Sequence, residues 1–268
     1  MSVFDVENLG YDYPGGITAL RGLSFRVTAG EALALVGANG AGKSTLLKLL
    51  DGLIFPSAGK LTAFGQPLTE QALRDARRNS EFRRRVGLVF QDPDVQLFSP
   101  TVWEEVTFAP LQLGLPQAEV MARGEEAMEL LQVTHLRERP PYRLSGGEKK
   151  RVALASVIAL GPEVLLLDEP TAGLDPQSQG KLIDFLMRWT ADGRNLIFST
   201  QDLDLVEEIA SRVLVLGAEH GLVADGHPEE FLMDAAFLLR TNLIHEHAHR
   251  HKSLIHRHQH FHEHQHES

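Results

Sequence analysis

The 268-residue sequence contains no cysteine and no long apolar run. The missing cysteines exclude disulfide bonds and thiolate metal sites, although they identify no compartment. No stretch approaches the roughly 18–20 apolar residues that a membrane-spanning helix needs. The amino terminus also lacks the basic segment and apolar stretch of a secretory signal. These absences favour a cytoplasmic chain that does not itself insert into a membrane.

A net positive charge is also missing, because the formal net charge is −10. Proteins that bind nucleic acid usually carry a positive surface, so the charge argues against such a partner. Hydrophobic residues make up 43% of the chain and charged residues 23%, which is typical of a globular protein. The length suffices for one large α/β core, with or without a subdomain.

A glycine-rich loop, GANGAGKST, occupies residues 37–45. It follows an apolar run at 32–36 and precedes a helical pattern at 46–50, which is the context expected of a phosphate-binding loop. The alternative is a turn that only connects strand to helix. Glycines let backbone N–H groups face phosphate oxygens, and the helix adds its positive end. We predict nucleoside triphosphate binding by Gly37, Ala38, Asn39, Gly40, Ala41, Gly42, Lys43, Ser44 and Thr45.

Within this loop three side chains can act chemically. Lys43 supplies a mobile cation for the terminal phosphates, and the Ser44 hydroxyl can ligate Mg²⁺. Thr45 offers a further hydrogen-bond donor. The sequence therefore predicts ATP and Mg²⁺ as cofactors.

Two carboxylates follow a second apolar run, VLLLDEP at residues 164–170. Consecutive aliphatic residues predict a buried parallel strand, and ligands of open α/β sheets bind at the carboxyl ends of such strands. Asp168 is expected to hold the Mg²⁺ shell, and Glu169 to reach a water in line with the γ-phosphate. The alternative is a pair of surface acids in a loop.

The segment RLSGGEKKR contains Ser145 and Glu148 at the spacing of a helix capping box. Between them Gly146 and Gly147 carry no side chain, so a phosphate could approach the bare N–H groups of the helix. We predict that Ser145, Gly146, Gly147 and Glu148 contact nucleotide.

The order of the predicted elements is that of an α/β protein. Apolar and polar residues alternate over 3–30, which predicts an antiparallel β layer. Residues 92–160 are predicted to form an inserted helical subdomain. Strands and helices then alternate, which favours a parallel sheet covered on both faces. The further elements expected are a strand at 86–90, a helix at 181–189, a strand at 195–200 and a last strand near 213–216. The arginine-rich run at 74–85 is most simply a solvated helix face, and a partner surface is the lesser alternative.

Together, GANGAGKST, Gln91, LSGGE, VLLLDE and the turn ending at Asp175 resemble the ATPase subunit of ABC transporters over residues 3 to about 230. The resemblance implies a RecA-like P-loop NTPase core with an amino-terminal β layer and an inserted helical subdomain. It implies an ATPase domain at 3–235, with Asp168 and Glu169 as the Walker B acid and the catalytic base. Gln91 would be the Q-loop glutamine, assisting Mg²⁺ and the attacking water.

The same resemblance gives Tyr13 an expected role and includes Asp175 among the residues expected to bind nucleotide. Tyr13 looks like the aromatic residue that stacks on adenine, although packing against the edge of the sheet explains a tyrosine there equally well. In the family, two subunits pair head to tail, and each LSGGE closes over the ATP of the other. A second ATPase subunit, with a homodimer sufficient, and transmembrane subunits are therefore the expected partners.

The family usually carries histidine after the strand at residue 200, where this sequence has Gln201. Glutamine can donate and accept a hydrogen bond but cannot carry a positive charge. We expect Gln201 to support hydrolysis more slowly than histidine would.

Ten of the 13 histidines lie in the carboxyl-terminal segment 242–268, which we expect to be disordered without metal. Neutral imidazoles suit Ni²⁺ and Co²⁺. A solvated tail, a pH-responsive cluster and a purification tag are the alternatives. The candidate ligands are His245, His247, His249, His251, His256, His258, His260, His262, His264 and His266.

The stretch GLVFQDPDVQLFSPTVWEEVTFAP is similar to energy-coupling-factor importers of the cobalt and nickel type. With the histidine tail, it predicts an ATPase that powers import of divalent transition-metal ions from the inner face of the membrane. The alternatives are an ABC ATPase for another solute, a nucleotide-gated clamp in DNA repair or translation, and a metal-storage protein with a vestigial ATPase.

Overall fold

The computed structural model describes residues 2–243, 245–251 and 254–260, and for the last two segments the backbone alone. Within these ranges no helix combines the length and the apolar character needed to cross a bilayer.

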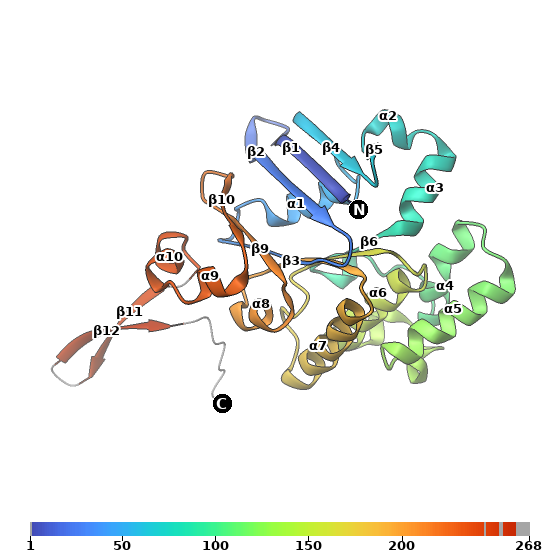
Figure 1. Ribbon diagram of the computed structural model, residues 1–268. Coiled ribbons are helices and arrows are strands. Elements are labelled where there is room, and N and C mark those ends of the chain that lie inside the picture. Colours follow the sequence, from blue (N-terminus) through green and yellow to red (C-terminus); the bar gives the residue numbers. More distant parts are fainter. Residues whose placement is uncertain (1, 244, 252–253, 261–268) are drawn as a thin grey trace.

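A six-stranded sheet forms the centre of the molecule, in the order β10-β9-β3-β8-β7-β6. Its neighbours pair in parallel, except that β10 runs antiparallel to β9. The strands are β3 (Ala32–Gly37), β6 (Val86–Val89), β7 (Val164–Asp168), β8 (Asn195–Thr200), β9 (Arg212–Leu216) and β10 (Leu222–Gly226). Figure 1 shows this sheet between helices below and a second sheet above.

The central strands are buried on both faces, as their unbroken apolar sequences predict. In β7, Leu165 and Leu167 pack in one hydrophobic cluster, whereas Val164 and Leu166 pack in the other. Side chains of a strand alternate between its two faces, so each face needs its own apolar cover. The sequence of β7 therefore requires a layer on each side of the sheet.

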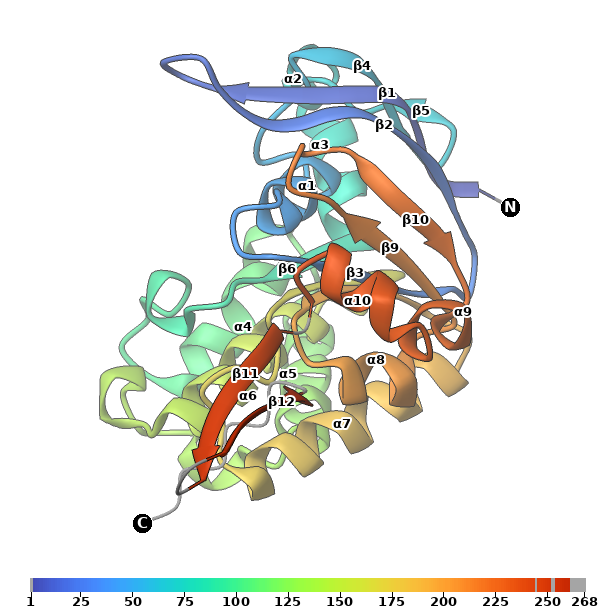
Figure 2. The ribbon, with the colours of Figure 1, turned by 90° about the vertical axis from the view of Figure 1, so that its left-hand side faces the viewer.

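One cover is a four-stranded antiparallel sheet in the order β2-β1-β4-β5, with helix α1 beneath it. Its strands are β1 (Ser2–Tyr13), β2 (Ile17–Thr28), β4 (Ala58–Ala63) and β5 (Gln66–Pro67). Figure 2 shows α1 (Lys43–Leu50) between this sheet and β3. The antiparallel layer expected for residues 3–30 is thus present, with a third and a fourth strand from farther along the chain.

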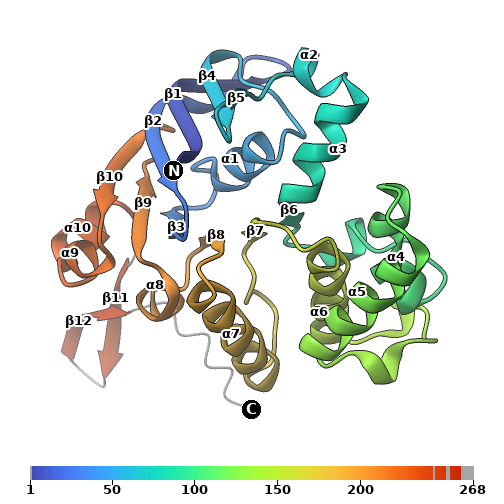
Figure 3. The same ribbon diagram turned by 45° about the vertical axis from the view of Figure 1, so that its right-hand side comes forward.

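Helices form the other cover and the insertion. The helices besides α1 are α2 (Glu70–Leu73), α3 (Ala76–Arg85), α4 (Val102–Gln112), α5 (Gln117–Leu130), α6 (Gly146–Ile158), α7 (Pro176–Ala191), α8 (Leu203–Ile209), α9 (Pro228–Leu232) and α10 (Ala235–Arg240). Short 3₁₀ turns lie at Pro93–Val95, Thr134–Leu136 and Pro141–Arg143. In Figure 3, α4, α5 and α6 lie together to one side, away from the antiparallel sheet.

Two predictions about the later elements were wrong, one on where a helix begins and one on which strand is the last of the sheet. The helix expected at 181–189 begins at Pro176, because the Asp175 side chain accepts a hydrogen bond from the backbone N–H of Ser178. The strand near 213–216 is not the last of the sheet, because the chain turns back at Gly217 and His220 and adds β10. His220 has a φ of 61°, a left-handed conformation suited to such a tight turn.

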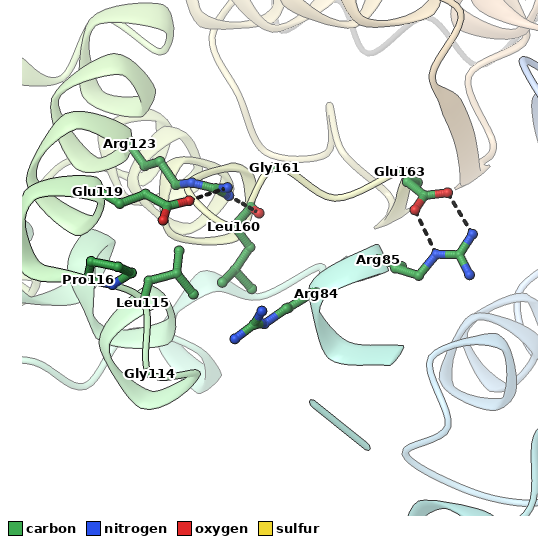
Figure 4. A pocket seen from close by; sticks show the side chains of 10 residues that line it. All are labelled: Arg84, Arg85, Gly114, Leu115, Pro116, Glu119, Arg123, Leu160, Gly161 and Glu163. Atoms are coloured by element: carbon green, nitrogen blue, oxygen red, sulfur yellow. Dashed lines mark hydrogen bonds and ion pairs between the residues drawn. The ribbon is translucent and has the colours of Figure 1, made fainter. Parts of the chain in front are cut away.

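The arginine run at 74–85 is only partly a solvated face. Arg84 donates from Nη2 to the backbone oxygen of Leu113 over 2.6 Å. Arg85 forms two hydrogen bonds of 2.6 and 2.8 Å with the carboxylate of Glu163. Both arginines line a cavity of about 350 Å³ between the core and the α4–α5 connection, and Figure 4 shows its lining residues. The end of the run therefore links the core to the helical insertion.

The histidine-rich segment was expected to be disordered, yet its described backbone forms a hairpin. Strand β11 (His245–His251) pairs antiparallel with β12 (Leu254–His260). Four of the predicted metal ligands are not paired with another histidine in the described hairpin. His251 stands opposite Leu254. The other three, His262, His264 and His266, lie outside the described residues.

Candidate functional site

Three groups of residues meet at the carboxyl ends of the parallel strands in the central sheet. The glycine-rich loop follows β3, Asp168 ends β7, and Gln201 follows β8. These strands are adjacent, in the order β3-β8-β7. Their carboxyl ends therefore bring together residues that lie more than 100 positions apart in the sequence.

The loop between β3 and α1 depends on glycine at Gly42. This residue precedes α1 with a φ of 101°, a conformation that side chains disfavour. A Cβ atom there would also collide with the backbone oxygen of Ala19. At Gly40, by contrast, a Cβ atom would meet nothing within 4 Å. Gly42 thus packs the loop against β2, while Gly40 leaves its outer surface open.

The side chain of Lys43 folds back over this loop and is only 6% exposed. Its Nζ donates to the backbone oxygen of Gly37 over 2.6 Å and lies 3.9 Å from Oε1 of Glu169. Burial lowers the pKa of Lys43, although the carboxylates of Glu169 and Asp168 oppose this shift. The ammonium group therefore sits between the loop and the two acids.

The buried carboxylate of Asp168 joins the loop to β8. Its Oδ1 accepts a hydrogen bond of 3.0 Å from the Ser44 hydroxyl and one of 2.6 Å from the Ser199 hydroxyl. A hydroxyl and a carboxylate this close are hard oxygen donors of the kind that Mg²⁺ prefers. The donor set of Ser44 and Asp168 therefore fits a magnesium ion.

Glu169 has an unusual backbone conformation, with a φ of 45°. Its N–H donates to the backbone oxygen and the hydroxyl of Ser199, over 3.2 and 3.0 Å. Burial raises the pKa of the Glu169 carboxyl, and the charge of Lys43 opposes the rise. A carboxylate with a raised pKa is better matched to accepting a proton from water near neutral pH.

Gln201 lies beside this carboxylate. Its Nε2 donates to Oδ1 of Asn39 over 2.7 Å and approaches Oε1 of Glu169 at 3.5 Å. The first contact is a strong hydrogen bond and the second is at the limit of one. Gln201 thus links the glycine-rich loop to Glu169.

Tyr13 lies at the other end of the loop. Its hydroxyl forms a hydrogen bond of 3.0 Å with Oγ1 of Thr45, and its ring packs edge-on against Tyr11, with 4.9 Å between centroids. An aromatic ring held beside the start of α1 is suitably placed for stacking on a base. The same contacts also satisfy the packing alternative.

The capping box predicted for LSGGE is present, but one glycine has a second role. The Ser145 hydroxyl accepts from the N–H of Glu148, whose carboxylate accepts from the N–H of Ser145. A Cβ atom at Gly147 would collide with the Ser178 hydroxyl, whereas at Gly146 it would meet nothing. Gly147 therefore allows α6 to approach α7 closely, and only Gly146 leaves open space at the helix tip.

Two of the predicted residues stand apart from this cluster. Gln91 is exposed, and within the described residues its side chain forms no hydrogen bond. Asp175 caps α7, where hydrogen bonds from Ser178 lower its pKa. Likewise, among the described contacts no hydrogen bond joins Ser145–Glu148 to the glycine-rich loop. These residues would need a nucleotide or another chain to act on phosphate.

Sequence reasoning missed Ser199, which contacts both acids. It is fully buried at the end of β8, in the run LIFST. A hydroxyl near the end of an otherwise apolar strand was the available signal, because a buried polar group needs a partner.

The sequence matches the family model described as ABC transporter over residues 20–172. It is 51% identical to the nickel import ATP-binding protein NikO of Rhodobacter capsulatus, over 90% of this chain and 95% of that protein. It is 46% identical to the cobalt import ATP-binding protein CbiO of the same organism, over 90% of this chain and 84% of that protein.

A solved structure of cbiO1 from Clostridium perfringens, part of the ABC transporter complex cbiONQ, gives a TM-score of 0.76 at 35% identity. The alignment covers 90% of this chain and 95% of that one. This likeness confirms the predicted fold class, and the family match confirms the resemblance seen in the motifs. The chain belongs to the ATP-binding subunits of ABC transporters.

Proposed function

We propose that this ABC ATPase powers a membrane importer of divalent transition-metal ions, nickel or cobalt, through ATP-driven closure of a dimer and its reopening after hydrolysis. One observation carries the proposed ATP hydrolysis. The Ser44 hydroxyl lies 3.0 Å from Oδ1 of Asp168, beside the contact between Lys43 and Glu169. We assign the ATPase domain to residues 3–235 and the histidine-rich tail to residues 242–268.

In the proposed reaction the loop at 37–45 holds the triphosphate of ATP. Lys43, released from the oxygen of Gly37, turns its ammonium group to the terminal phosphates. Ser44 and Asp168, with Gln91 brought in from its exposed position, would hold Mg²⁺, which neutralises charge on the phosphate oxygens when bound. Phosphoryl transfer depends mainly on such positioning and charge neutralisation.

Glu169 is the proposed base that accepts a proton from the attacking water. Gln201 would orient that water and the carboxylate through its amide group, which lies between Asn39 and Glu169. The neutral amide adds no positive charge next to the γ-phosphate. The proposed site is therefore active, but with less electrostatic stabilisation than a protonated histidine would supply.

A second copy of the chain completes the site in this proposal. The tip of α6 at Ser145 and Gly146 is exposed, and within one chain it makes no contact with the loop that the structure describes. Backbone N–H groups at a helix N-terminus attract phosphate. Head-to-tail pairing would bring this tip, and Asp175 close to it in the chain fold, to the ATP of the partner.

The proposed cargo rests on two independent features. The similarity to NikO at 51% identity and to CbiO at 46% favours nickel or cobalt. The histidine-rich hairpin offers imidazoles, which suit both ions. An importer of another solute is the second candidate, because the chain is also 42% identical to the energy-coupling factor transporter ATP-binding protein EcfA of Methanothermobacter thermautotrophicus, over 90% of this chain and 76% of that protein.

The backbone register of the hairpin supports a metal site in the tail. Histidines stand opposite one another in the pairs His245–His260, His247–His258 and His249–His256. These positions share one face of the hairpin, since residues two apart in a strand belong to the same face.

Transmembrane subunits are the proposed partners, and they would hold this chain at the inner face of the membrane. Exposed apolar side chains gather just after Gln91, where Val95 is 69% exposed and Phe98 67% exposed. Phe98 stacks edge-on against Phe108 of α4, with 4.8 Å between centroids. Exposed apolar groups of this kind mark protein contacts. We propose that a cytoplasmic segment of a membrane subunit covers them.

Metal uptake is the direct test of the proposed function. The chain is co-purified with its membrane partners, and the complex is reconstituted in vesicles loaded with or without Mg-ATP. We expect uptake of Ni²⁺ or Co²⁺ only with ATP, and its loss in a complex carrying Asp168→Asn. ATP-dependent uptake of a vitamin without metal uptake would favour the second candidate instead.

Replacement of the proposed base should separate ATP binding from hydrolysis. Glu169→Gln keeps the shape of the side chain but cannot accept the proton, so turnover should fall by about 100-fold or more. With Mg-ATP the variant should remain a dimer in size-exclusion chromatography with light scattering, whereas Lys43→Ala should stay monomeric. Turnover equal to that of the unmodified chain would show that Glu169 is not the base.

Gln201→His should raise the steady-state ATPase rate of the complete transporter. A charged donor contributes about 1 kcal/mol more than a neutral one, which corresponds to roughly a fivefold gain in rate. Gln201→Ala, which removes the amide, serves as the control and should lower the rate. A histidine variant slower than the unmodified protein would contradict the role proposed for Gln201.

Metal binding by the tail can be isolated by truncation. Isothermal titration with Ni²⁺ and Co²⁺ compares the full chain with one ending at residue 243, both without nucleotide. We expect saturable heat from the full chain alone, because the truncated chain keeps Ser44 and Asp168 but loses the clustered imidazoles. Equal heats from both proteins would show that the tail is not a metal site.

A further inference from the structure

Lys150 is a buried lysine in the α6 helix that the proposed reaction does not use. Its side chain is 6% exposed, and Nζ donates to the backbone oxygens of Glu169 and Ala172, each over 2.9 Å. Burial lowers the pKa of Lys150 to about 8, against the opposing charges of Glu169 and Asp168. An ammonium group this buried is costly unless specific partners compensate it. Here the compensating partners are two backbone oxygens of the turn that contains Glu169, the proposed base.

The backbone of Glu169 needs such partners. A φ of 45° is a left-handed conformation that a residue with a side chain keeps only where its surroundings enforce it. On one side, its N–H is fixed by Ser199 of β8. On the other, its oxygen accepts from Lys150 as well as from the N–H of Ala172. Lys150 is therefore the contact from α6 to the oxygen of Glu169, while Gln179 of α7 donates from Nε2 to the backbone oxygen of Thr171 in the same turn over 3.4 Å.

The adjacent residue attaches α6 to the far end of the same turn. Arg151 donates from Nη1 to the hydroxyl of Ser178 over 3.3 Å, and that hydroxyl donates to Asp175 over 2.6 Å. Gly147 packs against Ser178 as well. The segment from Glu169 to Ser178 is thus fixed at both ends to one rigid helix, whose tip carries the exposed residues Ser145 and Gly146 of the LSGGE motif.

We propose that Lys150 is a positioning residue, which holds the Glu169 turn from α6 so that the Glu169 carboxylate meets Lys43 and Gln201. This inference rests on the proposed role of Glu169 as the base. It has a consequence for the dimer: the helix that closes over the partner's ATP at its tip also sets the base for the chain's own ATP. Movement of α6 would then change the geometry at Glu169.

The test replaces Lys150 in the complete transporter and separates the rate of hydrolysis from ATP affinity. Lys150→Met keeps a similar shape and removes both hydrogen bonds. We expect kcat to fall by about tenfold or more, since a displaced catalytic group loses rate steeply, with KM for ATP changed less than about twofold. Lys150→Arg, which can still donate to both oxygens, should recover part of the rate. Lys60→Met, at an exposed position on β4, is the matched control.

Two further measurements exclude a purely structural role. Thermal unfolding checks that each variant is folded, and Lys150→Gln replaces Lys150→Met should the latter fail to fold. Mixed dimers then place Lys150→Met in only one of two differently tagged copies, with Lys43→Ala disabling the ATP site of the other. We expect loss of turnover when Lys150→Met lies in the copy with the working loop, and little change when it lies in the other copy.

Loss of turnover only from the second placement would mean that Lys150 acts by shaping the LSGGE tip, and would overturn the inference. An unchanged kcat for Lys150→Met in both copies would overturn it as well. These outcomes are distinct from failure of the proposed base, which is read from Glu169→Gln, and from failure of the proposed transport function, which is read from metal uptake. If Glu169→Gln abolishes turnover and Lys150→Met does not, the base stands and only the inference about Lys150 falls.

Discussion

The hydrogen bonds from Ser44 and Ser199 to one oxygen of Asp168 are the interaction on which the rest of the site depends. They connect the helix that follows β3, the last residue of β7 and the end of β8 at a single buried carboxylate. The strands can deliver these groups to one point because their parallel pairing aligns their carboxyl ends. That pairing in turn requires apolar cover on both faces, which the antiparallel sheet and helices α6–α8 supply.

Under the proposed function, the nucleotide site is divided between two places on one chain. The loop, the acids and Gln201 form one part, whereas the LSGGE tip of α6 lies in another, with its outward glycine open. This division gives ATP a role in assembly under the proposed function. The contacts of Lys150 and Arg151 keep the two parts mechanically connected within the chain, through the turn from Glu169 to Ser178.

Sequence patterns predicted much of this arrangement. The loop and the Asp168–Glu169 pair were visible because glycines, a lysine and acids follow apolar runs at fixed spacing, and such runs become buried parallel strands. The fold class followed from the alternation of strands and helices. Local patterns also predicted the capping box at Ser145, since its partner Glu148 lies only three residues away.

Other features depend on tertiary contacts that no local pattern encodes. Ser199 and Lys150 are polar residues within elements read as structural, and their partners lie 19 or more positions away in the chain. Gly147 was interpreted as opening a phosphate site, and its close contact with Ser178 of α7 was not visible in the local pattern. Arg84 and Arg85 looked like a solvated surface because their partners, Leu113 and Glu163, belong to other elements.

Because the chain contains no cysteine, the proposed division of the nucleotide site can be tested without background reaction from the chain itself. Two single-cysteine chains, Ala38→Cys within the loop and Arg143→Cys beside LSGGE, are mixed with the membrane subunits and a bifunctional maleimide. The account predicts cross-linking between unlike chains with Mg-ATP and little without nucleotide. Cross-linking that is absent under both conditions, or equal in both, would contradict it.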